Sequence, residues 1–304
     1  MKGGDSLIVS IITTVYNRKA KMLRLFESLE KQTNKNFEWI IVDDKSNDDT
    51  YEGLKIIEES SCNFKRRIKY LQQNSGKHIA LNYGIQMANG EITIIVDSDE
   101  VAYPEMISRV LQQWEISGRV SDQQLGVIVF ERFSSDGSPL RKVPHDNVRA
   151  NLVEYRYGNG LMGDYAETFK TSVLRKHVFP RFKDEKFLSE DYVWIDIGKV
   201  YDAIFIQQGI YTSRYDEDGL TFNSKRIMWD NPIGTMKLAE KRLSLKTPIY
   251  WKLKFIVVYM IFSFRNNVSI VSIFRKAPNK LFSMLLILPS YFVYRVMKSR
   301  FKVS

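Results

Sequence analysis

Four short strand-like segments, three of them apolar and rich in β-branched residues, alternate with helix-like patterns through the first hundred residues of the chain. The segments cover residues 7–14, 37–42, 68–72 and 92–96, and apolar residues at helical spacing occupy residues 18–32, 51–60 and 77–88. Strands that are joined through helices usually pair in parallel, because a parallel pair needs a long crossover connection. The sequence therefore predicts an α/β fold of the Rossmann-like type, with a mostly parallel sheet and flanking helices.

The last of these segments, Ile92–Val96, ends in two aspartates one residue apart, Asp97 and Asp99. In an extended chain their carboxylates point to the same side. Hard oxygen ligands suit Mg²⁺ or Mn²⁺ that bridges to phosphate, and open α/β sheets bind ligands at the carboxyl ends of their strands. This D-x-D motif predicts a metal and phosphate site, and the simpler alternative is a polar turn that ends the strand.

The charge of the chain is divided unevenly between its body and its C-terminal region. Residues 241–304 hold 13 Lys or Arg and no Asp or Glu, so the net charge of +10 leaves −3 for the rest. Three strongly apolar stretches lie in this basic region, at residues 253–264, 268–274 and 281–294. None reaches the roughly 20 unbroken apolar residues that a spanning helix needs, and Pro289 is expected to interrupt the last.

Residues 221–304 are expected to form a basic, helical region beside a first domain of residues 1–220. Aromatic and cationic residues beside apolar stretches are typical of helices that lie in the bilayer interface and attract anionic lipid. This membrane association is preferred over a helical subdomain packed on the body, a spanning helix, or nucleic-acid binding, for which no recognition motif is present. The lone Cys62 excludes an internal disulfide framework and no secretory signal is evident. A cytoplasmic location, peripheral on the inner face of the cell membrane, is therefore expected.

Four motifs follow one another at the ends of the predicted strands. They are VSIITTVYNR at residues 9–18, IIVDDKSNDDT at 40–50, NSGKHIALNYGI at 74–85, and DSD at 97–99 with Pro104 shortly after. In this order and spacing they resemble the family 2 glycosyltransferases, which are inverting, nucleotide-sugar-dependent enzymes of the GT-A fold. The resemblance is close over residues 7–110 and extends less tightly to residue 223.

The resemblance implies that side chains at the ends of the first two strands bind the nucleotide base. Asp44 would accept a hydrogen bond from the uracil ring, and Thr14 and Tyr16 would line the base pocket. A buried carboxylate that accepts from a ring N–H discriminates against bases without that donor. The alternative for these residues is an ordinary turn or capping role, and the choice of uridine over guanosine or thymidine rests on the resemblance alone.

The resemblance also implies how the rest of the donor is held. Lys77 would approach the nucleotide or its diphosphate as a point charge. Asp97 would touch ribose or sugar hydroxyls, and Asp99 would ligate Mn²⁺ or Mg²⁺. The alternative for Lys77 is a solvated lysine at the start of a helix.

The segment FLSEDYVW at residues 187–194 resembles the part of these enzymes that supplies the general base. An inverting transferase needs one base to deprotonate the acceptor hydroxyl. Adjacent carboxylates at a helix start can differ widely in pKa. Asp191 is preferred over Glu190, and both stay open beside a helix-capping role. Two further matches to the family are weaker. The resemblance implies that Asp164 holds the acceptor sugar, and residues 215–221 resemble a closing loop. The alternative for each is an acidic surface loop.

The resemblance therefore implies a metal-dependent inverting transferase that moves a hexose or N-acetylhexosamine from a UDP-sugar to a hydroxyl of a glycan or lipid-linked oligosaccharide. Such a reaction belongs to bacterial capsule, exopolysaccharide or O-antigen synthesis, and a homo-oligomer is possible. The alternative is a catalytically silent, nucleotide-sugar-binding module at the membrane. The intact carboxylate pairs Asp97/Asp99 and Glu190/Asp191 favour the enzyme. A nucleotidyltransferase is disfavoured because no glycine-rich pyrophosphorylase loop is evident.

Overall fold

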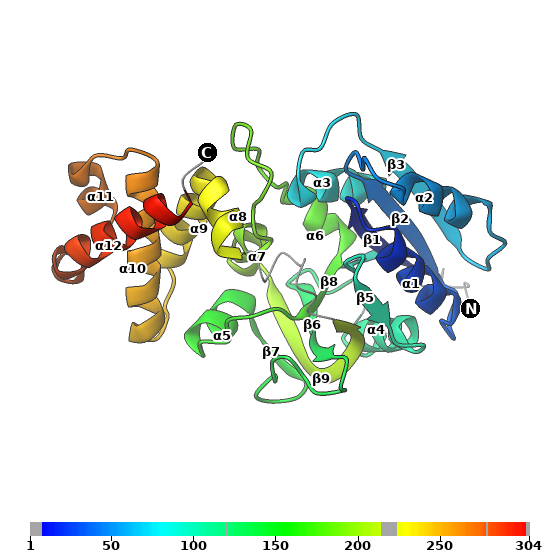
Figure 1. Cartoon of the computed structure of the whole chain (residues 1–304). Coiled ribbons are helices and arrows are strands. Elements are labelled where there is room, and N and C mark those ends of the chain that lie inside the picture. The colour runs from blue at the N-terminus through cyan, green and yellow to red at the C-terminus, as the bar shows by residue number, and fades with distance from the viewer. Residues whose placement is uncertain (1–7, 119–120, 214–223, 278, 302–304) are drawn as a thin grey trace. The chain divides into compact units, whose positions relative to one another are not determined.

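The computed structural model describes residues 8–118, 121–213, 224–277 and 279–301 (Figure 1). The chain divides into two compact units. The first consists of the described residues of Met1–Leu152, Gly163–Phe179 and Asp196–Arg214, and the second of those of Val153–Met162, Pro180–Ile195 and Tyr215–Ser304. The second unit thus takes in two segments of the predicted first domain. The predicted boundary after residue 220 and the predicted closing loop at 215–221 lie outside the described residues.

Within the described residues, the first unit is built on a nine-stranded sheet. Its strands are β1 (Val9–Val15), β2 (Phe37–Asp43), β3 (Lys65–Tyr70), β4 (Ile92–Ile95), β5 (Glu100–Ala102), β6 (Leu125–Ser134), β7 (Val148–Asn151), β8 (Ala166–Lys170) and β9 (Asp202–Ser213). Their order is β3-β2-β1-β4-β8-β6-β9-β5, and β7 pairs with β9. Strands β3, β2, β1 and β4 are parallel, whereas β8 is antiparallel to both β4 and β6. The predicted α/β fold is confirmed.

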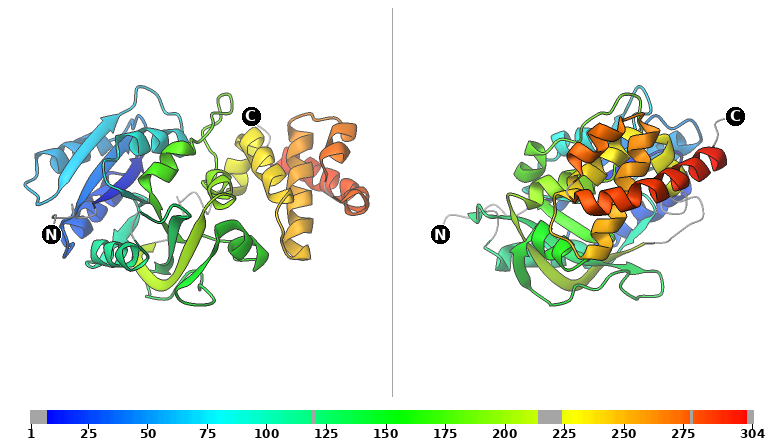
Figure 2. Two further views of the ribbon diagram at one scale, coloured as in Figure 1. Left: turned by 180° about the vertical axis from the view of Figure 1, so that it is seen from behind. Right: turned by 90° about the vertical axis from the view of Figure 1, so that its left-hand side faces the viewer.

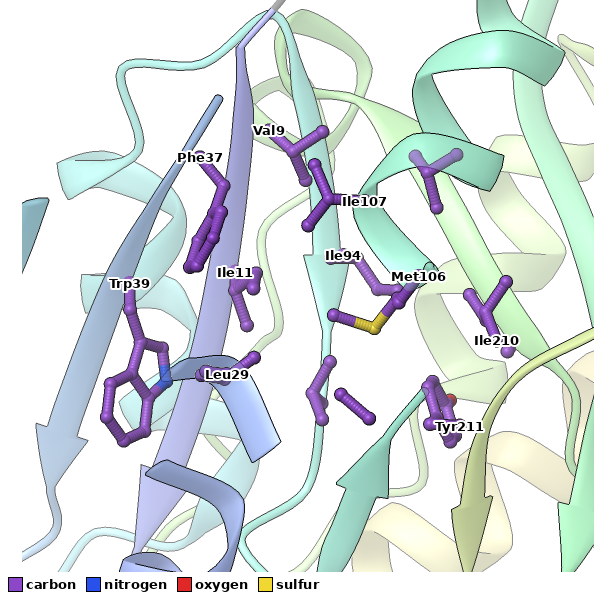
Figure 3. Packing of buried hydrophobic residues seen from close by; sticks show 14 of the residues in the cluster. Val9, Ile11, Leu29, Phe37, Trp39, Ile94, Met106, Ile107, Ile210 and Tyr211 are labelled. Atoms are coloured by element: carbon purple, nitrogen blue, oxygen red, sulfur yellow. The ribbon is translucent and has the colours of Figure 1, made fainter. Parts of the chain in front are cut away.

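Helices cover both faces of this sheet. Helices α1 (Lys19–Glu30), α2 (Thr50–Glu59) and α4 (Met106–Ile116) pack on one face, and α3 (Lys77–Met87) and α6 (Thr171–Lys176) lie together on the other. On the first face, Ile11 and Trp39 are buried with Leu29 and Met106 (Figure 3). On the second, a Cβ at Gly84 of α3 would lie 2.4 Å from Cγ2 of Ile12, so glycine permits this close approach. Strands buried on both faces explain the continuous apolar runs in the sequence.

The strands and helices predicted up to residue 96 are confirmed, each within a few residues of its predicted ends. The sequence analysis missed α4, β5 and β8. Strand β8 contains polar residues although it is buried between β4 and β6. Its Thr168 hydroxyl accepts a hydrogen bond from Nε1 of Trp114 and donates to the carbonyl of Ile128. The hydrogen-bonding groups of Thr168 are therefore satisfied by partners 54 and 40 residues away in the chain. Because the sequence does not show these partners, the polar residues of β8 did not suggest a buried strand.

The described part of the second unit is helical. It contains α5 (Leu152–Gly158) from Val153 onward, the start of α7 (Asp191–Gly198), α8 (Ser224–Asp230), α9 (Pro232–Leu243), α10 (Ile249–Arg265), α11 (Ile270–Lys276) and α12 (Lys280–Arg300). Helix α12 crosses α10 and packs against it (Figure 2). The predicted interruption at Pro289 is wrong, because α12 continues through it. Pro289 is exposed, so water can satisfy the carbonyl that loses its helical partner.

Candidate active site

The carboxyl ends of β1, β2 and β4 lie at one edge of the parallel part of the sheet. Strand β1 lies between the other two, in register with both. Beyond the strands, the Asp44 backbone N–H donates to the carbonyl of Val15, and that of Val96 donates to the carbonyl of Ile12. The three polar segments that the sequence singled out therefore leave the sheet side by side, where open α/β sheets bind ligands.

Asp44 fixes the loop that precedes α3. Asp44 is only 3% exposed, and its carboxylate accepts hydrogen bonds from the backbone N–H of Ser75, at 2.8 Å, and of Gly76, at 2.7 Å. Gly76 has a φ of +91°, a conformation that side-chain-bearing residues rarely adopt. Asp44 therefore shapes the start of α3, and a contact with a base stays a prediction. Thr14 is half-buried at the end of β1, and Tyr16 beyond it is exposed.

Lys77 is the first residue of α3, and its Nζ lies 2.6 Å from Oδ1 of Asp97. Burial would raise the pKa of Asp97, but Lys77 and Arg132 outweigh it and hold that pKa below its usual range. The pKa of Asp99, in contrast, is raised by burial and by the negative charge of Asp97. One aspartate of the pair thus has a cation beside it, and the other is held close to a like charge.

The aspartate pair fits a divalent cation. A cation at Asp99 would remove the repulsion that raises its pKa. The described residues contain no group of three or more His, Cys, Asp or Glu arranged to enclose a metal. Mg²⁺ in phosphate-transfer sites is typically held by one or two carboxylates together with phosphate oxygens and water, so a pair of aspartates is sufficient.

A buried network that the sequence analysis missed holds the turn between the two aspartates. Glu100 accepts a hydrogen bond from the Asp97 backbone N–H, at 3.1 Å, and another from the Ser213 hydroxyl, at 3.0 Å. It also forms an ion pair with Arg132. Burial raises the pKa of Glu100, and Arg132 opposes that rise. Glu100 therefore positions the D-x-D turn, and its place directly after the motif was the only signal in the sequence.

Arg132 connects this network to the predicted acceptor residue. Its Nη1 lies 3.7 Å from Oδ2 of Asp164, and its Nη2 is the atom that pairs with Glu100. The Arg132 side chain is 15% exposed and that of Asp164 is 59% exposed. The structure thus brings Asp164 to the same buried guanidinium that supports the aspartate pair, with its carboxylate open to solvent.

Asp191 lies in the second unit, surrounded by cations. Its carboxylate accepts a hydrogen bond from the Tyr157 hydroxyl at 2.8 Å, pairs with Arg242, and lies 3.5 Å from Nη2 of Arg156. Burial would raise the pKa of Asp191, but the two guanidinium groups outweigh it and lower that pKa to about 2. Glu190 is half-buried, and its carbonyl accepts the first backbone hydrogen bonds of α7, from Val193 and Trp194. The two neighbouring carboxylates therefore occupy different environments.

Comparison with known proteins gives the family. The profile described as Glycosyl transferase family 2 matches residues 10–176, which is more than half of the chain. The chain belongs to this family. The match confirms the predicted resemblance and includes every proposed donor residue and Asp164, whereas Glu190 and Asp191 lie beyond it.

Relatives of this family 2 glycosyltransferase come from several bacteria. It is 25% identical over 247 residues to the putative glycosyltransferase EpsE of Bacillus subtilis, covering 80% of this chain and 86% of that one. It is 24% identical over 241 residues to the GalNAc(5)-diNAcBac-PP-undecaprenol beta-1,3-glucosyltransferase of Campylobacter jejuni, covering 76% and 73%. Other matches are partial: the chain spans 34% of the length of an uncharacterized glycosyltransferase of Haemophilus influenzae, at 36% identity.

Solved structures show the same fold. The S. aureus TarS fragment 1-349 superposes with a TM-score of 0.65 at 16% identity, covering 97% of this chain and 91% of that one. The mannosyltransferase PcManGT from Pyrobaculum calidifontis, solved with GDP-Man and Mn²⁺, gives a TM-score of 0.57 at 15% identity, covering 97% and 83%. TarS 1-349 has also been solved with UDP. These matches confirm the predicted GT-A fold.

Proposed function

We propose that this family 2 glycosyltransferase is a metal-dependent inverting enzyme that transfers a hexose or N-acetylhexosamine from a UDP-sugar to a hydroxyl of a glycan or lipid-linked oligosaccharide. The observation that carries the proposal is the Asp97/Asp99 pair after β4, with Lys77 2.6 Å from Asp97 and the pKa of Asp99 raised by burial and by the charge of Asp97. A lysine beside a carboxylate that can ligate a divalent ion suits a diphosphate.

The donor residues have distinct tasks in this proposal. Asp99 would hold Mn²⁺ or Mg²⁺, which supplies positive charge that stabilises the departing UDP. Lys77 holds Asp97 in its charged form, ready to accept hydrogen bonds from ribose or sugar hydroxyls. Asp44 keeps the loop before α3 in place and accepts from the uracil N–H, beside Thr14 and Tyr16. UDP complexes of TarS support uridine as the base.

Glu190 is the better candidate for the general base, with Asp191 as the residue that positions it. An efficient base has a pKa near the working pH, and the pKa of Asp191 is about 2 with its oxygens already bound by Tyr157, Arg156 and Arg242. Glu190 would take the proton of the acceptor hydroxyl while that oxygen bonds to the anomeric carbon. The bond from this carbon to the phosphate oxygen breaks, and UDP leaves from the opposite face, which inverts the configuration.

The acceptor is proposed to be lipid-linked, with Asp164 as one of its contacts and the protein peripheral on the inner face of the cell membrane. The name of the Campylobacter relative specifies an undecaprenol-linked acceptor, which supports this choice. The basic, apolar region of residues 241–304 supports a membrane location. Such a reaction would serve the synthesis of capsule, exopolysaccharide or O-antigen.

The experiment that tests the proposal is UDP release from a panel of UDP-sugars, with Mn²⁺ or with EDTA. We expect Mn²⁺-dependent release for the wild type and none for Asp99→Asn. The matched control is Asp230→Asn, which removes an exposed aspartate paired with Arg226 on α8. Binding of UDP-sugar without release or transfer under any condition would instead support the catalytically silent module.

A further inference from the structure

Helix α12 exposes a row of large apolar side chains on the face that turns away from α10. Leu281, Leu285, Leu288 and Phe292 are 65%, 65%, 76% and 69% exposed. Their spacing of four, three and four residues places them on one side of the helix. Among the described residues, eight of the twenty exposed large apolar side chains lie on α12. Isolated exposed leucines are common in soluble proteins, but a continuous row of them marks a contact surface.

The opposite face of α12 packs against the other helices of the second unit. Ser283 and Ser290, seven residues apart, are completely buried. Phe282 and Leu286 pack against the core formed by α9 and α10. Near the other end, the ring of Tyr294 lies 5.9 Å from that of Phe264 and 6.0 Å from that of Trp229. The inner face therefore holds the helix in place, so that the exposed face cannot turn inward.

The charged residues of α12 itself are all positive. Lys280 stands at the start of α12, and Arg295, Lys298 and Arg300 stand near its end, all of them exposed. No Asp or Glu occurs anywhere in residues 241–304. An apolar row with cations at both ends is complementary to acyl chains and anionic headgroups, whereas a self-association surface of the same kind would bring like charges together.

The dimensions of the apolar stretch favour a helix in the membrane plane. Among the described residues, α12, with 21 residues, is the one helix long and apolar enough to cross a membrane. Its uncharged part, however, has only the 14 residues between Lys280 and Arg295, a length of about 21 Å against a hydrocarbon thickness of about 30 Å. Its inner face also packs on α10 and is not available to lipid.

We propose that the exposed face of α12 is the membrane-binding surface of this protein. Leu281, Leu285, Leu288 and Phe292 enter the outer part of the acyl layer. The basic residues near the end of α12, Arg295, Lys298 and Arg300, bind anionic headgroups. The helix lies parallel to the bilayer. The inference deepens the membrane location proposed above and does not depend on glycosyl transfer.

The test is co-sedimentation of the full chain with vesicles of phosphatidylcholine alone or mixed with phosphatidylglycerol. We expect Leu285→Glu/Leu288→Glu to weaken binding to the mixed vesicles about a hundredfold, because each leucine buries several methylene groups. The matched control is Ile56→Glu/Ile116→Glu, which places the same charges at positions of the first unit that are 51% and 66% exposed. This control should bind like the wild type.

A second variant separates charge from apolar contact. Lys298→Gln/Arg300→Gln should weaken binding about fivefold per lost charge on vesicles with phosphatidylglycerol, and leave binding to phosphatidylcholine unchanged. Circular dichroism and UDP calorimetry verify that each variant is folded. If the wild type binds vesicles but does not bind UDP, the donor proposal is refuted and the membrane-binding role of α12 is not.

Three results would overturn the inference. The first is vesicle binding that Leu285→Glu/Leu288→Glu leaves unchanged. The second is a wild type that sediments as a dimer and a variant that sediments as a monomer, with neither protein binding vesicles. That result would assign the face to a second copy of the chain. The third is retention in the membrane pellet after alkaline carbonate extraction, which would indicate a spanning helix; an in-plane helix should be released.

Discussion

Asp191→Asn removes a negative charge that the guanidinium groups of Arg156 and Arg242 share. Arg156 and Arg242 both contact the Asp191 carboxylate, and Tyr157 donates a hydrogen bond to it. The Asp191 and Arg156 side chains are 14% and 7% exposed and that of Arg242 is 26% exposed, so solvent screens the Arg156 contact less than the Arg242 contact. An asparagine of similar size would leave the buried Arg156 and the half-buried Arg242 without a counter-charge.

The magnitude follows from the pKa. The usual aspartate pKa of 3.8 and the pKa of about 2 for Asp191 differ by nearly two units, which corresponds to about 2.5 kcal/mol of folding free energy. Removing one member of a buried ion pair typically costs about 3–5 kcal/mol, because the remaining charge is uncompensated. We therefore expect Asp191→Asn to lower the free energy of unfolding at pH 7 by about 2–5 kcal/mol.

The assay is urea unfolding of the wild type, Asp191→Asn and the control Asp230→Asn, followed by circular dichroism. Asp230 also pairs with an arginine, at 2.7 Å, but on the surface, so its variant should lose less than about 0.5 kcal/mol. Because the pKa of Asp191 is lowered on folding, its contribution is present above pH 4 and is lost as the pH falls toward 2. The gap between wild type and Asp191→Asn should thus be constant from pH 7 to 5 and shrink below pH 4. If Asp191→Asn lowers the free energy of unfolding at pH 7 no more than Asp230→Asn does, Asp191 does not stabilise the fold through Arg156 and Arg242.

Two further predictions concern catalysis and donor binding. Glu190→Gln should lower kcat about 10²–10⁴-fold and leave the Kd for UDP within about twofold, because a general base acts on the acceptor. Steady-state kinetics measures kcat and calorimetry measures the Kd. An unchanged kcat would exclude Glu190 as the general base. Lys77→Met should raise the pKa of Asp97, which Lys77 now holds down, and weaken UDP binding by about 1–2 kcal/mol in calorimetry; unchanged affinity would restrict Lys77 to a structural role.

The sequence predicted those parts of the molecule that depend on local pattern. The alternation of strands and helices up to residue 96 rests on hydrophobic periodicity and turn residues, and it is confirmed. Pro289 shows the limit of such rules: an exposed proline is tolerated in α12, whose packing on α10 is formed by the opposite face. Propensity alone could not show that tertiary contacts would stabilise this helix.

The environment of each carboxylate could not be predicted from the sequence. Asp191 and Glu190 are adjacent and look equivalent in a motif, yet Asp191 has partners 34 and 51 residues away in the chain. Glu100 likewise depends on Arg132 and Ser213, which are 32 and 113 residues distant. Because these contacts set the charge state of each group, the sequence could name the candidates but could not divide their roles.

The central claim is that Asp99 binds a nucleoside diphosphate through a divalent metal, with Asp97 beside it on the ribose or sugar hydroxyls. The most direct measurement is calorimetry of UDP binding to the wild type and to Asp99→Ala, with Mn²⁺ and with EDTA. We expect the wild type to bind UDP with Mn²⁺ and to lose most of that affinity in EDTA, and Asp99→Ala to bind weakly in both. UDP affinity that neither EDTA nor Asp99→Ala changes would contradict the claim.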